Sequence, residues 1–399
     1  MTKRNRTAII NKKTKFWEFT KMRYELIATS TFGLEAVVRR EIEALGYKIL
    51  QVEDGRITYL GDERAVVRSN LWLRTADRVY VKLGDFSAKS FEELFQQTKA
   101  IAWEEIIPSD GSFPVVGTSV KSTLHSVPAC QSIIKKAVVD RLQFFYQTKE
   151  LPETGAEYRI RFAVLKDRFI MMMDTSGDGL HKRGYRVKDV PAPIKETLAS
   201  ALVQLSFYRA DKQLVDTCCG SGTIPIEAVM IERNIAPGLG RAFASEKWDV
   251  IPSEIWTEER KSAYSAVDYD KELRIKGFDI DRKAIEAAKA NADEMGLLDD
   301  IEFLRMNMCK FEPEGEYGVV ISNLPYAKRV GSVEGNAEIY EHFSKLMKEH
   351  PTWSFFLITA DKELEKRIGR KADRRRKLYN GNIETQFYQF YGIKPPKKV

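Results

Sequence analysis

Apolar residues at strand-like and helical spacing predict a small α+β unit at the start of the chain. Residues 24–29 are apolar and β-prone, and residues 33–45 carry apolar positions at helical spacing before a glycine. Residues 47–52 and 56–59 are typical of a hairpin, because an Asp-Gly pair between them supplies the turn. We therefore expect one unit over residues 22–70.

A second unit of the same kind is predicted over residues 71–175. We expect strands at 78–86, 114–120, 158–165 and 168–173, and helices at 90–101 and 129–146. The later helix carries Lys135, Lys136 and Arg141 on its polar surface, and Lys121 lies in the segment before it. These cations suit contact with phosphates, although a solvated helix face would look the same.

The pattern changes after a Gly-, Pro- and basic-rich linker over residues 176–195. From residue 196 to 399, helices alternate with short apolar strands, which is typical of a parallel sheet covered by helices on both faces. The expected strands lie at residues 213–216, 274–279, 301–305, 318–322 and 354–359.

Composition and charge narrow the possible classes of protein. The 399 residues suit two or three globular domains, and no apolar run is long enough to span a membrane. Four cysteines without a C-x-x-C pair indicate neither zinc nor disulfides, so a reduced, cytoplasmic setting is expected. Residues 1–21 carry seven Lys/Arg and one acid, and residues 361–399 carry twelve and five. Two basic ends favour a polyanionic partner, although residues 1–21 could equally be a disordered, solvated leader.

The first candidate ligand-binding segment is Asp216–Thr223, which follows a short predicted strand and begins a predicted helix. Gly220 and Gly222 let the backbone approach a ligand, and the helix N-terminus offers free N–H groups. A dehydrogenase loop would need a third glycine, and a P-loop would need a Gly-Lys pair; neither is present. A structural turn remains the alternative for this loop taken alone.

The ends of the next two strands add further ligand-binding groups. Asp279 is placed to accept the hydroxyl hydrogens of a ribose, as the acid of a dinucleotide-binding fold does. Asp281 is better explained as the cap of the following helix. After the third strand, Asn307 and Met308 offer an amide and an apolar contact for an adenine ring.

The fourth strand leads into Asn323-Leu324-Pro325-Tyr326. This tetrapeptide supplies an amide oxygen, a carbonyl directed by the following proline and an aromatic ring. A flat base with an exocyclic amine can be held by two hydrogen-bond acceptors and an aromatic ring on which it stacks. In isolation the same residues could form an ordinary turn, but their position after Asp279 favours a base-binding function.

Together these motifs resemble class I S-adenosylmethionine-dependent methyltransferases that modify amino groups. Other segments, including Gly33–Val38, Leu180–Arg186 and Arg376–Gly381, are similar to the bacterial THUMP-domain RNA methyltransferases, and the resemblance covers nearly the whole chain from Met22. It implies an α/β fold: a Rossmann-like methyltransferase domain preceded by a ferredoxin-like unit and a THUMP RNA-binding domain. The branch that matches best forms N2-methylguanosine in 23S ribosomal RNA.

The resemblance implies an enzyme that uses S-adenosylmethionine and releases S-adenosylhomocysteine. The favoured partner is RNA, either 23S rRNA or a ribosome assembly intermediate, with no metal or membrane. The expected catalytic residues are Asn323, Leu324, Pro325 and Tyr326. The expected cofactor-binding residues are Asp216, Cys219, Gly220, Gly222, Thr223, Asp279, Ile280, Asn307, Met308 and Asn323. The expected RNA-binding residues are Lys121, Lys135, Lys136, Arg141, Arg183 and Arg186.

Three hypotheses remain open at this stage. The first is an rRNA guanine-N2 methyltransferase, and the second is the same chemistry on tRNA. The third is a catalytically weak RNA-binding relative that acts in ribosome assembly, because Leu324, Ala327 and Lys328 depart from the family pattern N-P-P-Y-G-E-R. Cys219 in the glycine turn is explained by packing, since covalent catalysis needs an activated thiolate.

Overall fold

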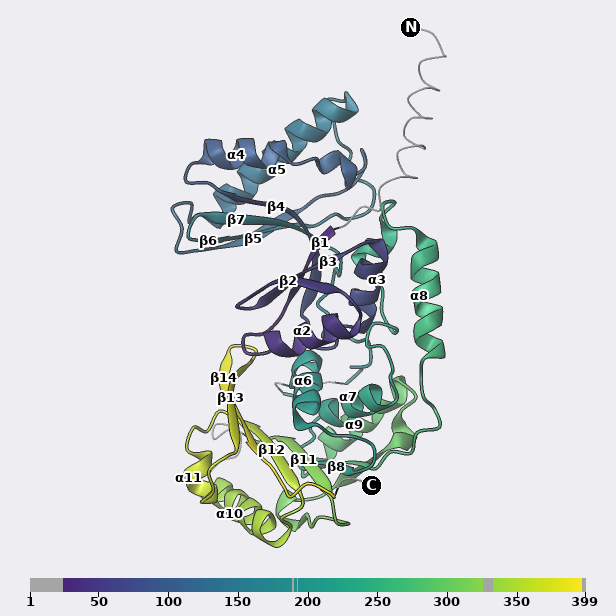
Figure 1. Ribbon diagram of the computed structural model, residues 1–399, viewed down its shortest axis with the longest axis vertical. Helices are drawn as coiled ribbons and strands as arrows, with labels where there is room; N and C mark the ends of the chain where they lie inside the picture. The colour runs from purple at the N-terminus through teal and green to yellow at the C-terminus, as the bar shows by residue number, and fades with distance from the viewer. Residues whose placement is uncertain (1–23, 189, 192, 326–332, 397–399) are drawn as a thin grey trace.

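The computed structural model describes residues 24–188, 190–191, 193–325 and 333–396, with side chains described from 337 in the last range. Within these residues the chain forms two seven-stranded sheets, which lie one above the other in Figure 1. None of the described helices has the length and apolar content needed to span a bilayer. The predicted leader, residues 1–21, lies outside the described residues.

The first sheet joins the two N-terminal units into one continuous structure. Its strands are β1 (Tyr24–Thr29), β2 (Lys48–Glu53), β3 (Arg56–Gly61), β4 (Arg78–Ser87), β5 (Val115–Val120), β6 (Ile160–Leu165) and β7 (Arg168–Asp174). β4 pairs antiparallel with β1, where Val81 faces Leu26, and also with β7, where Val81 faces Met173. The order is therefore β2-β3-β1-β4-β7-β6-β5, and β4 belongs to both units.

Four helices of the N-terminal half share a hydrophobic core with this sheet, and Trp256 from the C-terminal half joins the same core. The four helices are α2 (Glu35–Ala44), α3 (Glu63–Trp72), α4 (Phe91–Ala100) and α5 (Val127–Tyr146). Local sequence explains where they begin: Ser90 and Glu93 form a capping box at α4, and the Asp62 side chain accepts a hydrogen bond from Ala65 N at α3. α3 is absent from the sequence prediction, whereas α2, α4 and α5 lie where they were expected.

The second sheet contains the five predicted strands and a further hairpin. Its strands are β8 (Gln213–Asp216), β9 (Ile275–Asp279), β10 (Ile301–Arg305), β11 (Gly318–Asn323), β12 (Ser354–Thr359), β13 (Arg374–Asn380) and β14 (Ile383–Phe390). β8 to β12 are parallel, whereas β14 pairs antiparallel with β12 and β13 pairs antiparallel with β14. The hairpin corrects the purely parallel sheet expected from the sequence.

The strand order places a ligand crevice at a definite position. The order is β10-β9-β8-β11-β12-β14-β13, so the chain runs outward from β8 to β10 and then returns to β11 on the other side of β8. Ligands of open α/β sheets bind beyond the carboxyl ends of the strands at such a switch point. The helices of this half are α6 (Glu196–Ser206), α7 (Thr223–Glu232), α8 (Ser253–Ser265), α9 (Arg282–Glu294), α10 (Val333–Glu349) and α11 (Leu364–Ile368).

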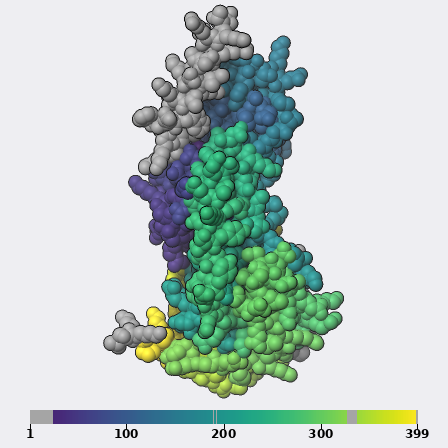
Figure 2. Space-filling view, turned by 90° about the vertical axis from the view of Figure 1, so that its right-hand side faces the viewer, coloured from purple at the N-terminus to yellow at the C-terminus, as the bar shows by residue number. Residues whose placement is uncertain are grey.

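The two halves are joined by more than the predicted linker. α8, in green, lies along the N-terminal half in Figure 2, and Arg64 of α3 forms ion pairs with Glu258 and Glu259 of α8. The Trp248 ring stacks on Tyr158, with the ring centroids 5.1 Å apart. In the described part of residues 176–195, Leu180, Arg183 and Tyr185 are buried.

Candidate active site

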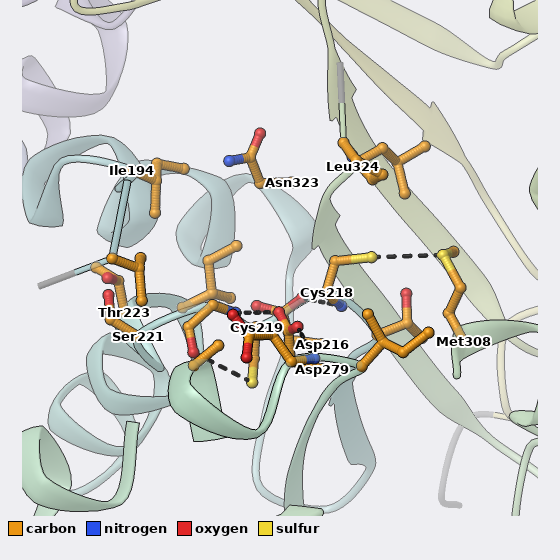
Figure 3. A pocket seen from close by; sticks show the side chains of 18 of the residues that line it. Ile194, Asp216, Cys218, Cys219, Ser221, Thr223, Asp279, Met308, Asn323 and Leu324 are labelled. Atoms are coloured by element: carbon orange, nitrogen blue, oxygen red, sulfur yellow. Dashed lines mark hydrogen bonds between the residues drawn. The ribbon is translucent and has the colours of Figure 1, made fainter. Parts of the chain in front are cut away.

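The tips of β8, β9 and β11 open onto one cavity of about 510 Å³. Figure 3 shows this cavity, with Asp216 and Asp279 on one side and Asn323 and Leu324 on the other. The lining includes Asp216, Cys219, Gly220, Thr223, Asp279, Ile280, Asn307, Met308, Asn323, Leu324 and Pro325. The motifs singled out from the sequence therefore meet at one site, except for Tyr326, which lies outside the described residues.

Two glycines shape the loop between β8 and α7. Gly220 and Gly222 have φ angles of +54° and +81°, in the left-handed region that glycine adopts without strain. A Cβ at Gly222 would also lie 3.0 Å from both Ala288 Cβ and the Phe303 ring. Gly222 does not line the cavity itself, but it caps α7 and lets the loop close over α9.

Asp216 is a fully buried acid at the floor of the cavity. Its Oδ1 accepts hydrogen bonds from Cys218 N at 3.1 Å and from Ser322 Oγ at 3.0 Å. Burial raises the pKa of Asp216 to about 7, the charge of Asp279 adds to this increase, and the two hydrogen bonds oppose it. Among the described residues, no cation forms an ion pair with this carboxylate, so a cationic ligand would stabilise its charged form.

Asp279 connects the glycine loop to the end of β9. Its Oδ2 accepts a hydrogen bond from Gly220 N at 3.0 Å, and its Oδ1 accepts one from Asp281 N at 2.9 Å. A carboxylate has about four lone-pair sites, so acceptor capacity remains for ligand hydroxyls. Asp281 caps α9 by accepting from Lys283 N at 2.9 Å, which confirms the structural role expected for it.

The β10 side of the cavity supplies mainly apolar surface. Met308 is buried, and its Sδ lies 3.4 Å from Cys218 Sγ. The Asn307 side-chain oxygen accepts from Cys309 N at 3.0 Å and caps the short 3₁₀ turn Met308–Lys310. The Asn307 oxygen is therefore already engaged, which leaves its amide NH₂ as the group available to a ligand.

The Asn323-Leu324-Pro325 turn forms the opposite rim. Leu324 is 2% exposed, and its N–H donates to Ile358 O at 3.0 Å, which anchors the turn on β12. Asn323 ends β11 and lines the cavity. Both residues thus stand on a rigid strand end, which is the requirement for orienting a base.

Sequence reasoning missed two parts of the cavity wall. Val190, Pro191, Pro193 and Ile194 come from the segment described as a linker, and Glu338 and Ile339 come from α10. The Pro-Ala-Pro pattern was the available signal, because rigid proline segments often shape a loop beside a site. The linker is therefore also part of the candidate site.

The cysteines of the cavity are not activated nucleophiles. Burial raises the pKa of both Cys218 and Cys219 well above the ordinary value, and the charges of Asp216 and Asp279 raise them further. The thiols therefore stay protonated at neutral pH. This observation supports the packing role expected for Cys219.

The six predicted RNA-contacting cations fall into three groups. Lys121 and Lys136 are exposed, as a phosphate contact requires. Lys135 forms an ion pair with Glu153, and Arg141 forms one with Glu104.

The expectation that Arg183 and Arg186 contact RNA requires a correction, because both side chains are engaged within the fold. Arg183 is 2% exposed and pairs with Glu227, while Arg186 pairs with Glu196 and donates to Ser221 Oγ and Thr223 Oγ1. Both hold the fold together around α7.

A glycine loop, an acid on the adjacent strand tip and an Asn-Leu-Pro turn around one switch-point cavity define a class I methyltransferase. Matches to family models confirm this class. The chain belongs to the RMKL-like methyltransferase domain family, whose model matches residues 183–389. The RlmL ferredoxin-like domain matches residues 25–80, and the THUMP domain matches residues 88–174. The chain is thus an RNA methyltransferase of the RlmK/L type.

Individual relatives agree with this assignment. The chain is 46% identical to the "Putative RNA methyltransferase YpsC" of Bacillus subtilis (strain 168), over 94% of this chain and 98% of that protein. It is 29% identical to the ribosomal RNA large subunit methyltransferase K/L of Cellvibrio japonicus (strain Ueda107), over 92% of this chain but only 51% of that protein. The chain thus spans about half the length of this second relative.

One solved relative carries a cofactor product. The structure of SMU.472 in complex with SAH has a TM-score of 0.90 to this chain at 43% sequence identity, and the match covers 94% of this chain and 100% of that one.

Proposed function

We propose that this protein transfers a methyl group from S-adenosylmethionine to the exocyclic N2 of a guanine in large-subunit ribosomal RNA. The observation that carries the proposal is the single cavity shared by Asp216, Asp279 and the Asn323–Pro325 turn. A donor site and a base-binding turn on the same crevice suit direct transfer between two bound molecules.

The residues of the cavity fit S-adenosylmethionine. A volume of about 510 Å³ lies within the usual range of small-molecule sites. Asp279 would accept the ribose hydroxyls, Met308 would contact the adenine, and Asp216 would face the positively charged part of the cofactor. When bound, the cofactor supplies a methyl group on a positively charged sulfur.

The chain's own contribution to the chemistry is to orient the target amine. The Asn323 side-chain oxygen and the Leu324 carbonyl would accept the two N–H bonds of the guanine amino group. This contact draws the nitrogen lone pair out of the ring and aims it at the cavity. Well-oriented reactants reach effective molarities of about 10⁵ to 10⁸ M. The N–CH₃ bond would form as the S–CH₃ bond breaks, and one proton would then leave the methylated N2 for solvent, so no residue is assigned as a general base.

Two alternatives use the same fold. The rRNA substrate is supported by the name of the Cellvibrio japonicus relative, while a tRNA guanine would place the same demands on Asn323 and Leu324. The third reading, a catalytically weak RNA-binding relative, rests on the variant Asn323-Leu-Pro-Tyr-Ala-Lys-Arg segment. Residues 326–329 of this segment lie outside the described residues.

Nucleoside mass spectrometry of ribosomal and transfer RNA from cells with and without the gene tests the substrate. We expect one N2-methylguanosine to disappear from large-subunit RNA. Loss of a tRNA mark with an unchanged rRNA map would favour a tRNA guanine as the substrate. Unchanged maps in both RNAs would contradict the proposal and favour a catalytically weak RNA-binding protein.

Two variants separate donor binding from base orientation. D279A should weaken cofactor binding by about 10- to 100-fold, because hydrogen bonds to a charged group contribute about 1.5–3 kcal/mol. N323A should keep cofactor affinity and lower kcat about 10²-fold. D281N, at the helix cap beside the site, is the matched control and should change neither quantity strongly. Equal losses in all three variants would contradict the assigned roles.

A further inference from the structure

One face of the C-terminal hairpin carries uncompensated positive charge. Side chains alternate along β13, so Arg374, Arg376 and Leu378 share one face and Arg375 and Lys377 share the other. The second face is neutralised, because Arg375 pairs with Glu365 and Lys377 with Glu384. Among the described residues, neither Arg374 nor Arg376 forms an ion pair with an acid.

The N-terminal half adds a third guanidinium to the uncompensated face. Leu378 packs in the same core as Leu34 and Val37 of α2, and a Cβ on Gly33 would lie 2.8 Å from Lys377 O. The hairpin therefore abuts α2, as Figure 1 shows. Arg40 follows one turn after Val37 on this helix. Burial lowers the pKa of Arg376, and the charges of Arg374 and Arg40 lower it further.

Two buried N–H donors on this face have no acceptor within the described structure. They are Arg376 Nε and Gln389 Nε2. Gln389 is 1% exposed and stands directly opposite Arg374 in the β13–β14 register. A buried donor without a partner costs about 1–3 kcal/mol, and three clustered guanidiniums repel one another. A bound anion would relieve both costs.

We propose that Arg40, Arg374, Arg376 and Gln389 form a binding site for a backbone phosphate of the substrate RNA. Arginine is the residue best suited to this task, because its planar group matches phosphate oxygens. The site rests on the proposed function only in taking RNA as the ligand. It joins the two halves of the molecule through one ligand, since Arg40 belongs to α2 and the other residues belong to the methyltransferase sheet.

The register fixes the distance between this site and the active site. Asn323 lies beside Ile358, Ile358 beside Phe387, and Phe387 beside Arg376. Arg376 is thus in the same cross-strand row as Asn323, three strands away. Strands are about 4.8 Å apart, so the separation is about 15 Å. A short stretch of RNA spans such a distance, so a phosphate near the target nucleotide can occupy the site.

The test compares two double variants that remove the same charge from opposite faces of one strand. R374Q/R376Q removes the proposed site, and R375Q/K377Q removes the two paired cations. Binding of a fluorescein-labelled single-stranded RNA of mixed sequence is followed by anisotropy over a range of salt concentrations. We expect R374Q/R376Q to bind about 5- to 20-fold more weakly and to lose about one to two units of salt-dependence slope. The control should lose about twofold or less.

Folding and cofactor binding are measured on the same samples. R374Q/R376Q should keep its affinity for S-adenosylhomocysteine and melt no lower than the unmodified protein, because it removes mutual repulsion. Equal RNA affinities for both double variants would overturn the site. So would tight, saturable binding of inorganic phosphate that RNA does not displace. If R374Q/R376Q bound RNA as tightly as an unmodified protein that methylates RNA normally, the phosphate site would be wrong and the proposed function would stand. Absence of RNA methylation would instead count against the proposed function.

Discussion

Asp216 and Glu227 are both buried acids of the methyltransferase half, but their surroundings differ. Glu227 accepts hydrogen bonds from Arg183 Nε at 3.3 Å, from the Tyr185 hydroxyl at 3.2 Å and from Ser200. Among the described residues, Asp216 accepts hydrogen bonds only from a backbone N–H and one hydroxyl, and it faces a cavity. Arg183 balances the charge of Glu227, whereas no cation in the described part of the chain pairs with Asp216.

This difference gives a rule for interpreting buried charge in this molecule. A buried charge that is paired indicates a structural clasp, as at Arg183, in the segment before α6, and Glu227 of α7. A buried charge that no cation of the described structure balances, as at Asp216, or a partly buried cation that no acid balances there, as at Arg376, suits a ligand of the opposite charge. Removing such a group from water costs free energy, and a bound ligand would offset that cost.

Breaking the clasp should have the largest effect. R183A leaves the Glu227 carboxylate buried without its cation, which costs about 3–5 kcal/mol of unfolding free energy. Urea-induced unfolding followed by circular dichroism measures the loss. R282A is the matched control, because Arg282 pairs with Glu286 at the surface and should contribute less than about 1 kcal/mol. Similar values for both variants would contradict the clasp.

Neutralising the unbalanced acid should have the opposite effect on stability. D216N keeps the shape of the side chain and removes a buried charge, so the ligand-free protein should become more stable at pH about 8. The shift in the pKa of Asp216 from 3.8 to about 7 corresponds to roughly 4 kcal/mol. Affinity for S-adenosylmethionine should fall at least about tenfold, by calorimetry. A variant that lost stability and kept affinity would contradict the ligand-binding role.

The same carboxyl predicts a pH dependence whose sign is fixed. Because the folded-state pKa lies above the unfolded value, the stability contributed by this group is present at low pH and is lost as pH rises from about 4 to about 7. Cofactor binding requires the charged form, so affinity should rise up to about tenfold per pH unit below 7 and level off above it. D216N should remove this dependence, and an unchanged profile in that variant would assign it to another group.

The smallest effect is expected at Cys219, a buried residue beside both acids. C219A removes one sulfur atom and should cost about 1 kcal/mol of stability. Its methyl transfer rate should stay close to that of the unmodified protein, since the thiol stays protonated. Single-turnover assays would show this directly. A loss as large as that of N323A would reopen the covalent cysteine mechanism.

The sequence predicted the parallel strands well because their apolar runs are short and sharply bounded. β8, β10 and β12 have the predicted bounds, and the residues at the tips of β8, β9 and β11 meet in one cavity, as their order along the chain required. β13 was missed because only Leu378 in it is buried, and an exposed edge strand rich in Arg lacks the alternation of a half-buried strand.

Other misses come from contacts between residues distant in sequence. Arg183 and Arg186 were expected to contact RNA, because their acidic partners Glu227 and Glu196 can be identified only from the fold. α3 crosses the predicted boundary at residue 70, and that boundary divided its apolar face between two units. A pattern within a short window does not report such long-range pairing.

The strand shared by the two N-terminal units has a consequence for how targets are selected. A hinge between these units would have to break the hydrogen bonds that β4 makes with β1 on one side or β7 on the other. The spacing between the ferredoxin-like unit and the THUMP domain is therefore fixed by the sheet that they share. An RNA that contacts both units would have to match this spacing in its own folded shape.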